Sequence, residues 1–122
     1  MRTKEKLYDV LSSYGYPVFL QGSVNKDASY PDTFITYWAW EAPESGFYDN
    51  APTSCDWGFW VYVYSNSPRT VDELSGQVKS DLVKAGFVAS GKPIDAASDK
   101  PTHTGAMLSI YYKEVYNNDS TE

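Results

Sequence analysis

Apolar residues alternate with other residues along several segments of this chain, and the alternation predicts a β-sheet. A half-buried strand carries an apolar residue at every second position. The segments Thr33 to Glu41 and Asp56 to Ser65 go further, because both of their alternating sets are apolar or aromatic and together they hold all four tryptophans. We therefore expect one face of this sheet to pack on helices and the other to suit a partner.

Two segments have the spacing of amphipathic helices. The first runs from Thr3 to Tyr14, with a stripe made of Leu7, Val10, Leu11 and Tyr14. The second is expected to begin at a capping box formed by Thr70 and Glu73 and to end at Gly86. Its apolar stripe is Val71, Leu74, Val78, Leu82 and Ala85.

Shorter β-rich segments complete the pattern: Tyr16 to Gln21, Phe87 to Ala89 and Ala106 to Val115. The predicted order is α-β-β-β-α-β-β, an α+β fold with a mostly antiparallel sheet and two helices packed on one face. We expect residues 1–116 to form a single domain and residues 117–122 a polar C-terminal tail. The connection from Ala42 to Ser54 holds two prolines and a glycine. It is too long for a tight turn, so we expect it to be irregular and mobile.

Composition narrows the function classes. The formal net charge is −6, and no basic cluster is denser than Arg2, Lys4 and Lys6, which disfavours nucleic-acid binding. No apolar run of membrane-spanning length or signal peptide is visible. The lone Cys55 fits a reducing compartment such as cytoplasm.

The candidates for chemistry are few. His103 is the only histidine, and Asp95 and Asp99 lie in a loop between prolines, so the ligand set is thin for a metal or a general base. Cys55 adjoins Asp56, whose charge would raise the pKa of the thiol. We expect neither an enzyme nor a cofactor or metal site.

The aromatic strands are the better candidates for function, although aromatic residues in strands are usually core. By parity, Trp57, Phe59, Val61 and Val63 suit the interior, which leaves Trp60, Tyr62 and Tyr64 facing outward. Trp38 and Trp40 share one face of the neighbouring strand, opposite Ile35, Tyr37 and Ala39. With two aromatics of the long connection, the candidate interface is Trp38, Trp40, Phe47, Tyr48, Trp60, Tyr62 and Tyr64.

Several short motifs together resemble a known family. They are Tyr14-Gly-Tyr-Pro-Val18, Tyr30-Pro-Asp-Thr-Phe-Ile-Thr-Tyr37, Phe47-Tyr-Asp-Asn50, Trp57 with its aromatic strand, Ala85-Gly-Phe87 and Ser98-Asp-Lys-Pro-Thr-His-Thr-Gly105. Over nearly the whole chain they are similar to tail terminator, or tail-to-head joining, proteins of long-tailed phages and prophages of low-GC Gram-positive bacteria. The order of elements also resembles this family's fold.

The resemblance implies a virion structural protein without catalytic residues. Such a protein is assembled in the bacterial host cytoplasm and resides in the tail or neck, where it forms a ring, usually hexameric. The ring caps the tail tube protein and faces the head connector protein. No sequence-specific nucleic acid or membrane is expected as a partner. A neighbouring tail-completion protein of similar fold, or a small ligand-binding domain or enzyme with an aromatic-lined cleft, remains the alternative.

Overall fold

The structure is a computed structural model that describes residues 2–20, 31–98 and 100–116. Within these ranges, two helices and seven strands follow one another. They are α1 (Thr3–Ser12), β1 (Val18–Leu20), β2 (Thr33–Glu41), β3 (Glu44–Ser45), β4 (Ser54–Ser65), α2 (Pro68–Lys84), β5 (Val88–Ala89), β6 (Ile94–Ala96) and β7 (Thr104–Val115). The α+β class and the predicted order are confirmed, and β3 and β6 are short additions to that order.

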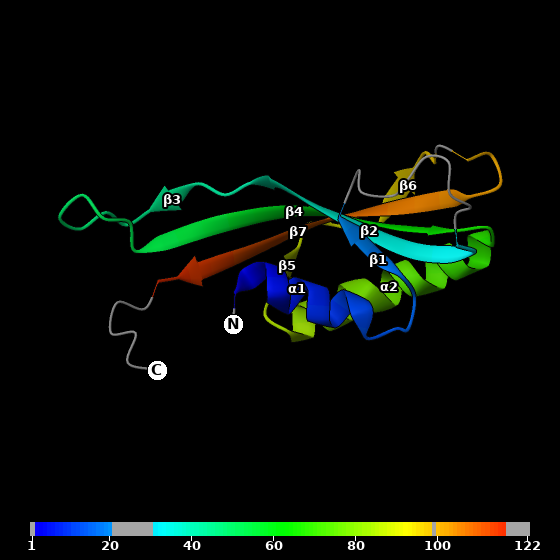
Figure 1. Ribbon diagram of the computed structural model, residues 1–122, viewed down its shortest axis with the longest axis horizontal. Coiled ribbons are helices and arrows are strands. Elements are labelled where there is room, and N and C mark those ends of the chain that lie inside the picture. Colours follow the sequence, from blue (N-terminus) through cyan, green and yellow to red (C-terminus); the bar gives the residue numbers. More distant parts are fainter. Residues whose placement is uncertain (1, 21–30, 99, 117–122) are drawn as a thin grey trace.

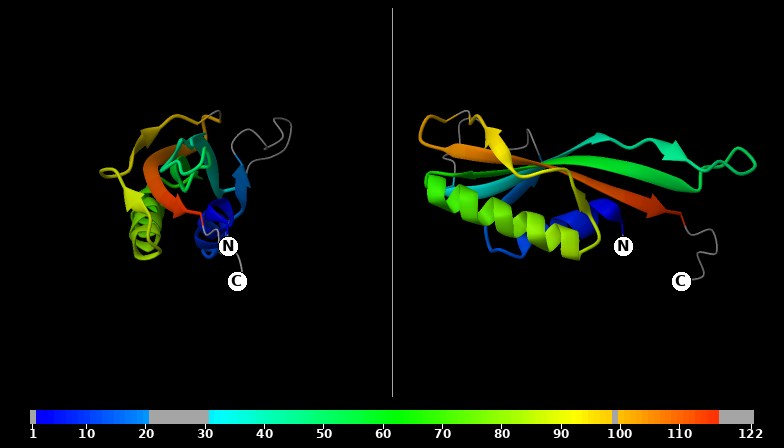
Figure 2. Two further views of the ribbon diagram at one scale, coloured as in Figure 1. Left: turned by 90° about the vertical axis from the view of Figure 1, so that its left-hand side faces the viewer. Right: turned by 180° about the vertical axis from the view of Figure 1, so that it is seen from behind.

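The strands form one sheet in the order β1-β2-β4-β7-β5, with β3 beside β4 and β6 beside β7. Only β1 and β2 are parallel, and every other pair is antiparallel. Both helices lie side by side against one face of this sheet (Figure 1). The opposite face carries no described helix (Figure 2). This second face is called the outer face below.

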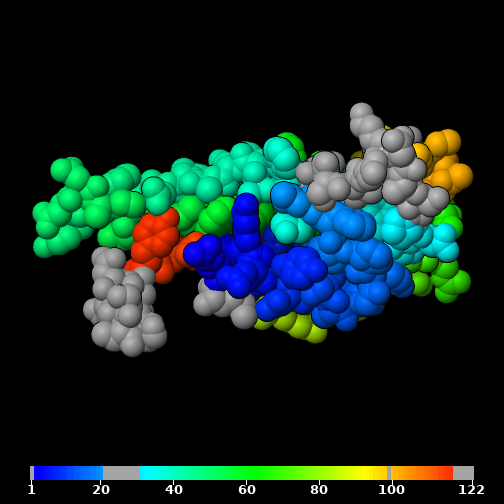
Figure 3. Space-filling model, viewed as in Figure 1, coloured from blue at the N-terminus to red at the C-terminus, as the bar shows by residue number. Residues whose placement is uncertain are grey.

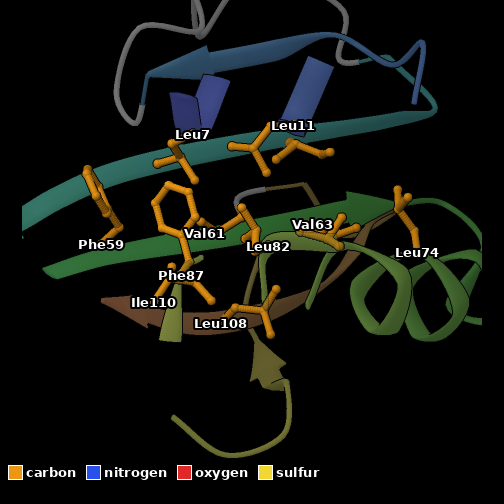
Figure 4. Close-up of a cluster of buried hydrophobic side chains, with 12 residues drawn as sticks. Leu7, Leu11, Phe59, Val61, Val63, Leu74, Leu82, Phe87, Leu108 and Ile110 are labelled. Atoms are coloured by element: carbon orange, nitrogen blue, oxygen red, sulfur yellow. The ribbon is translucent and has the colours of Figure 1, made fainter. Parts of the chain in front are cut away.

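The core lies between the helices and the inner face of the sheet (Figure 4). Phe59, Val61 and Val63 of β4 are fully buried there, so the interior assignment of this parity is confirmed. Each such side chain stabilises the fold by about 1.5–3 kcal/mol through burial alone. The whole cluster is Leu7, Leu11, Ile35, Phe59, Val61, Val63, Leu74, Val78, Leu82, Phe87, Leu108 and Ile110.

The second helix begins earlier than the capping box predicts. Ser67 is the N-cap, and its hydroxyl oxygen accepts a hydrogen bond of 3.3 Å from the backbone N–H of Thr70. Pro68 follows in the first turn, where its fixed φ suits a helix and its missing N–H costs nothing. The Thr70 prediction was therefore wrong by one turn, because Ser67 and Pro68 supply the stronger start signal.

The connection between β2 and β4 is a hairpin and not an irregular loop. β3 pairs with the start of β4, and Tyr48 and Ala51 exchange backbone hydrogen bonds of 2.8 and 2.9 Å around a two-residue turn. Asp49 and Asn50 in that turn have φ values of 51° and 64°, as a type I′ turn requires. The expectation of a connection too long for a tight turn was thus wrong. Residues 42–56 are called the hairpin arm below.

The arm projects well past the ends of both helices (Figures 1 and 3). Its root is fixed by Glu114 of β7, whose Oε1 accepts hydrogen bonds from the Thr3 hydroxyl (3.0 Å) and from the Trp57 indole (2.7 Å). This carboxylate joins α1, β4 and β7 at one point. The arm therefore extends from a firmly held base.

Candidate interaction surfaces

The outer face of the sheet is lined by aromatic residues from three neighbouring strands. Cross-strand register sets Phe34 opposite Tyr64, Thr36 opposite Tyr62 and Trp38 opposite Trp60. On the other side of β4, register sets Tyr111 opposite Gly58 and Met107 opposite Tyr62. Directly opposed side chains in a sheet lie on the same face and contact one another. The candidate residues of β2 and β4 are therefore brought together on one surface.

Three rings are in contact at the root of the arm, those of Trp40, Trp60 and Tyr111, and Trp38 lies beside them as the cross-strand partner of Trp60. Trp40 stacks on Trp60, with ring centroids 5.6 Å apart, and meets Tyr111 edge-on at 6.2 Å. Trp38 is 44% exposed and Trp40 is 38% exposed, so neither belongs to the core. The interpretation of these two tryptophans as simple core residues is excluded. We call Trp38, Trp40, Trp60 and Tyr111 the tryptophan cluster.

Tyr111 was not among the residues predicted for this surface. The sequence places it in a β-strand with Met107 and Ser109 on the same parity, but parity does not give the register against β4. Only that register sets Tyr111 opposite Gly58, where the missing side chain leaves room for Trp40 to reach it. A glycine within an aromatic strand was the available signal, because it often marks a close approach of other groups.

Tyr64 departs from the expectation that it faces a partner. It is only 9% exposed and stacks on Phe34 with centroids 5.1 Å apart. Its ring lies over Gly105, where a Cβ would come within 2.7 Å of it. Tyr64 thus covers its own sheet, and we correct it from a contact residue to a structural one. Tyr62 stacks on Tyr64, with ring centroids 5.9 Å apart. Because Tyr62 is only half-buried, it still reaches solvent.

The tip of the hairpin arm is a second apolar surface. Phe47 is 65% exposed and Tyr48 is 74% exposed, and both directly precede the chain reversal at Asp49 and Asn50. The backbone beneath them is fixed, because Gly46 has φ 68° and lies against Thr53 so closely that no Cβ would fit. In the space-filling view the arm is a narrow extension of the molecule (Figure 3). Two large apolar side chains are therefore presented to solvent, far from the core.

The polar candidates have structural environments. The His103 Nε2 lies 2.8 Å from the Pro31 carbonyl oxygen and its Nδ1 lies 2.9 Å from the Thr102 hydroxyl, while its ring meets Phe34 edge-on at 5.9 Å. These contacts fix the loop before β7 against the start of β2. Asp95 is exposed on β6, and Asp99 lies outside the described residues.

Cys55 is buried, and its thiol donates to the Ala42 carbonyl oxygen at 3.4 Å. Burial raises the pKa of this thiol, and the carboxylates of Glu114, Glu44 and Asp56 raise it further, against a lowering hydrogen bond from Tyr116. A raised pKa keeps the group in the unreactive thiol form at neutral pH.

Among the described residues, no three His, Cys, Asp or Glu side chains gather closely enough to hold a metal ion. Neither described helix has both the length and the apolar character that crossing a bilayer requires. The candidate surfaces of the described residues are the tryptophan cluster and the tip of the arm, where large apolar side chains are exposed. No protein-family model matches the sequence, and a search of curated proteins gives no significant match.

Proposed function

We propose that this chain is a structural protein of a long-tailed phage or prophage, which caps the tail tube and joins the tail to the head without catalysis. The observation that carries the proposal is the pair of separate apolar surfaces on one small chain. Trp38 and Trp40 are exposed on the sheet, and Phe47 and Tyr48 are exposed at the tip of the arm. Exposed apolar groups gathered in this way mark interaction sites.

A ring needs this kind of subunit. Cyclic assemblies close through heterologous contacts, in which one patch of each subunit meets a different patch of the next. A chain with a single self-complementary interaction surface forms only a two-fold symmetric dimer. This chain has two exposed apolar surfaces of different shape. The proposed partners are further copies of the chain in a ring, the tail tube protein and the head connector protein.

Charge supports the same proposal. The chain carries 16 acidic and 10 basic residues. An acidic ring repels the phosphate backbone, so DNA would pass through its lumen without being held. This agrees with a conduit between head and tail, and it disfavours a role in binding DNA.

The test is deletion of the gene from a lysogen, followed by induction and electron microscopy of the lysate. We expect full heads and separate tails that fail to join, and restoration of joined particles by the gene supplied in trans. Normal numbers of joined, infectious particles in the deletion strain would refute the proposal. Where heads and tails fail to join as expected, capture of tail tube protein by the purified chain would support direct contact with the tube.

The second candidate function is ligand binding, which the exposed Trp38 and Trp40 favour because planar aromatic side chains also suit sugar rings or other flat ligands. A Trp38→Ala/Trp40→Ala variant separates the two candidates. Under the assembly proposal this variant loses particle joining and shows no ligand-dependent change in thermal stability. A soluble oligosaccharide that stabilises the wild-type chain and not this variant would support the second candidate.

A further inference from the structure

Two strands at the arm end of the sheet have backbone edges that no described strand covers. On the side of β7 away from β4, β6 pairs as far as Met107 and β5 as far as Tyr111. The rest of this edge, from Tyr112 to Val115, has no strand beside it within residues 2–20, 31–98 and 100–116. β3 pairs with β4 alone, so its far edge is open in the same sense. Both edges lie where the sheet extends past the helices (Figures 1 and 2).

The backbone of β7 points alternately toward β4 and toward the open edge. The Ser109 carbonyl oxygen accepts a hydrogen bond of 2.9 Å from the segment that follows β5, whereas the Tyr116 N–H donates to the Thr53 carbonyl oxygen beside β4 at 2.8 Å. Successive residues of an antiparallel ladder face opposite neighbours. Lys113 and Val115 have the parity of Ser109, so their N–H and C=O groups face the open edge.

The backbone of β3 has a matching row of groups. The Pro43 carbonyl oxygen accepts from the Asp56 N–H at 2.9 Å, so Pro43 faces β4 and its missing N–H is also on that side. Ala42 and Glu44 therefore face the open edge, and both keep an N–H there. The Cys55 thiol donates to the Ala42 carbonyl oxygen at 3.4 Å, but a carbonyl oxygen has a second lone pair.

The two open edges match in direction and spacing. β3 and β7 are each antiparallel to β4, so they run the same way. A second copy that continues the sheet with the same face outward therefore sets its β3 parallel to β7. In a parallel pair, one residue bonds to the two residues that flank its partner. Val115 fits between Ala42 and Glu44 in this way: its N–H donates to the Ala42 carbonyl oxygen, and its carbonyl oxygen accepts from the Glu44 N–H.

The position of β5 selects this register. If Pro43 of the second copy lay beside Lys113, its Glu41 would lie beside Tyr111, where β5 already pairs. With Pro43 beside Val115, Glu41 lies beside Lys113 and β5 is undisturbed. Beyond Glu41 the second copy has to turn away from β5. Its own ladder shifts at that point, between Ala39 and Glu41, and a bulge bends the strand that carries it.

The side chains agree with the same register. Lys113 and Glu41 are both exposed, and opposite charges on neighbouring strands stabilise their pairing. Asp56 is the cross-strand neighbour of Lys113 in its own chain, but the two form no salt bridge in the described part of the chain. Val115 is 71% exposed and gains cover from Pro43.

We propose that copies of this chain join edge to edge, with β3 of one copy adding to the open edge of β7 in the next. Unpaired strand edges are ready templates for such additions. The two edges are different surfaces, so the contact is heterologous and can repeat from copy to copy. The inference deepens the proposed function and rests on the self-association that it assumes.

Proline substitutions on the two edges test the contact. Val115→Pro removes an N–H from the β7 edge, and Ala42→Pro removes one from the β3 edge. Both N–H groups face away from β4, so each variant keeps its own ladder, as proline on an edge strand does. The matched controls Val115→Thr and Ala42→Ser keep the N–H groups. Circular dichroism verifies folding, and sedimentation velocity over a concentration series measures association.

The wild type and both controls should form oligomers larger than a dimer as the concentration rises. Each proline variant should associate at least about tenfold more weakly, because it loses a backbone hydrogen bond and its ring blocks the added strand. An equimolar mixture of the two proline variants should form dimers and nothing larger. Each mixed pair keeps one intact β7 edge and one intact β3 edge, which allows a single contact.

A charge swap tests the register without proline. Glu41→Lys should weaken association, because it sets two cations side by side. The double variant Glu41→Lys/Lys113→Glu should restore association, since the pair is again of opposite sign. Normal association of the Glu41 variant, or no recovery in the double variant, would overturn the proposed register.

The edge contact is overturned if the wild type stays monomeric, if the proline variants associate normally, or if their mixture forms no dimers or forms larger oligomers. These outcomes are separable from the fate of the proposed function. Dimers in the mixture, together with joined particles in the deletion strain, would support the contact and refute the function. Proline variants that associate normally, in a chain whose deletion separates heads from tails, would refute the contact and leave the function standing.

Discussion

Trp40 stacks on Trp60 although the two residues are not cross-strand partners. The ladder between β2 and β4 shifts at this point: Ala39 faces Phe59 and Glu41 faces Gly58, so Trp40 is the extra residue of a β-bulge. A bulge redirects a side chain and strengthens the local twist. Here it turns the Trp40 indole across Gly58, onto Trp60 and toward Tyr111. The tryptophan cluster is thus built by a break in the ladder.

A methyl group at Gly58 should displace Trp40. In a Gly58→Ala variant the new Cβ would lie 3.0 Å from the Trp40 ring and 2.9 Å from the Glu41 Cγ, so the indole has to move. We expect a shifted NMR resonance of the Trp40 indole N–H. We also expect the free energy of unfolding to fall by about 1–2 kcal/mol, which is typical of overpacking. The control is Gly76→Ala in α2, where nothing lies within 4 Å of the new methyl group. That change should stabilise the helix by about 0.5–1 kcal/mol. An unchanged Trp40 resonance in the Gly58 variant would contradict this account of the cluster.

The two faces of β4 should respond differently to a buried charge. Val61 is fully buried between the sheet and the helices, whereas Tyr62 on the outer face reaches solvent. Val61→Asp should unfold the domain, since an unpaired buried carboxylate costs several kcal/mol of a total stability of roughly 5–15 kcal/mol. Tyr62→Asp should leave the fold intact and weaken assembly. Circular dichroism and particle assembly measure the two effects, and the reverse result would show that the faces are misassigned.

The long elements of the fold were predictable because each carries its own periodic signal. β2 has the predicted bounds, and β4 begins two residues before the predicted Asp56. β3 and β6 were not predicted, since strands of two and three residues are too short to show alternation and depend on their neighbours β4 and β7. Their stability comes from tertiary pairing, which no local window reveals.

The candidate surface was predictable by parity but not by packing. Parity assigned Tyr62 and Tyr64 to the same outer face, and the structure places them there. What parity could not give is that Gly105 lies opposite Tyr64 and lets its ring lie flat and buried. Phe47 and Tyr48 were predicted as interface residues, but the hairpin that presents them was missed, because the turn residues Asp49 and Asn50 were interpreted as part of an irregular loop.

The contact between Tyr14 and Asp81 should make stability depend on pH. The Tyr14 hydroxyl donates to Asp81 Oδ2 at 2.6 Å and lowers the pKa of this carboxyl group, with a further contribution from Gln77. A lowered folded-state pKa means that the stabilisation is present above the unfolded pKa of about 3.9 and is lost as the pH falls through the lower, folded value. Burial and the hydrogen bond to Asp81 raise the pKa of Tyr14, so its contribution is complete below about pH 10 and is lost as the pH rises further.

A Tyr14→Phe variant removes this contact. We expect urea denaturation to show a stability difference from the wild type that is constant near neutral pH and shrinks toward both pH extremes. Tyr8→Phe is the control, because Tyr8 is exposed on α1, the helix that directly precedes Tyr14. The same profile in both variants would mean that the hydrogen bond to Asp81 is not its cause.

Shortening the arm should separate folding from assembly. Ser45 and Ser54 are cross-strand partners, so residues 46–53 can be replaced by Asn-Gly, which favours the same type I′ turn. None of the core cluster lies in this segment. The largest local loss is the hydrogen bond from the Tyr116 backbone N–H to the Thr53 carbonyl oxygen. Because one hydrogen bond is lost, we expect the free energy of unfolding to change by no more than about 1.5 kcal/mol. Urea denaturation should therefore remain cooperative with a similar midpoint.

Particle joining should fall as strongly as in the Phe47→Ser/Tyr48→Ser control, which keeps the backbone of the arm. Loss of cooperative unfolding would instead assign the arm a role in the fold itself, because a surface appendage contributes nothing to the packing between helices and sheet.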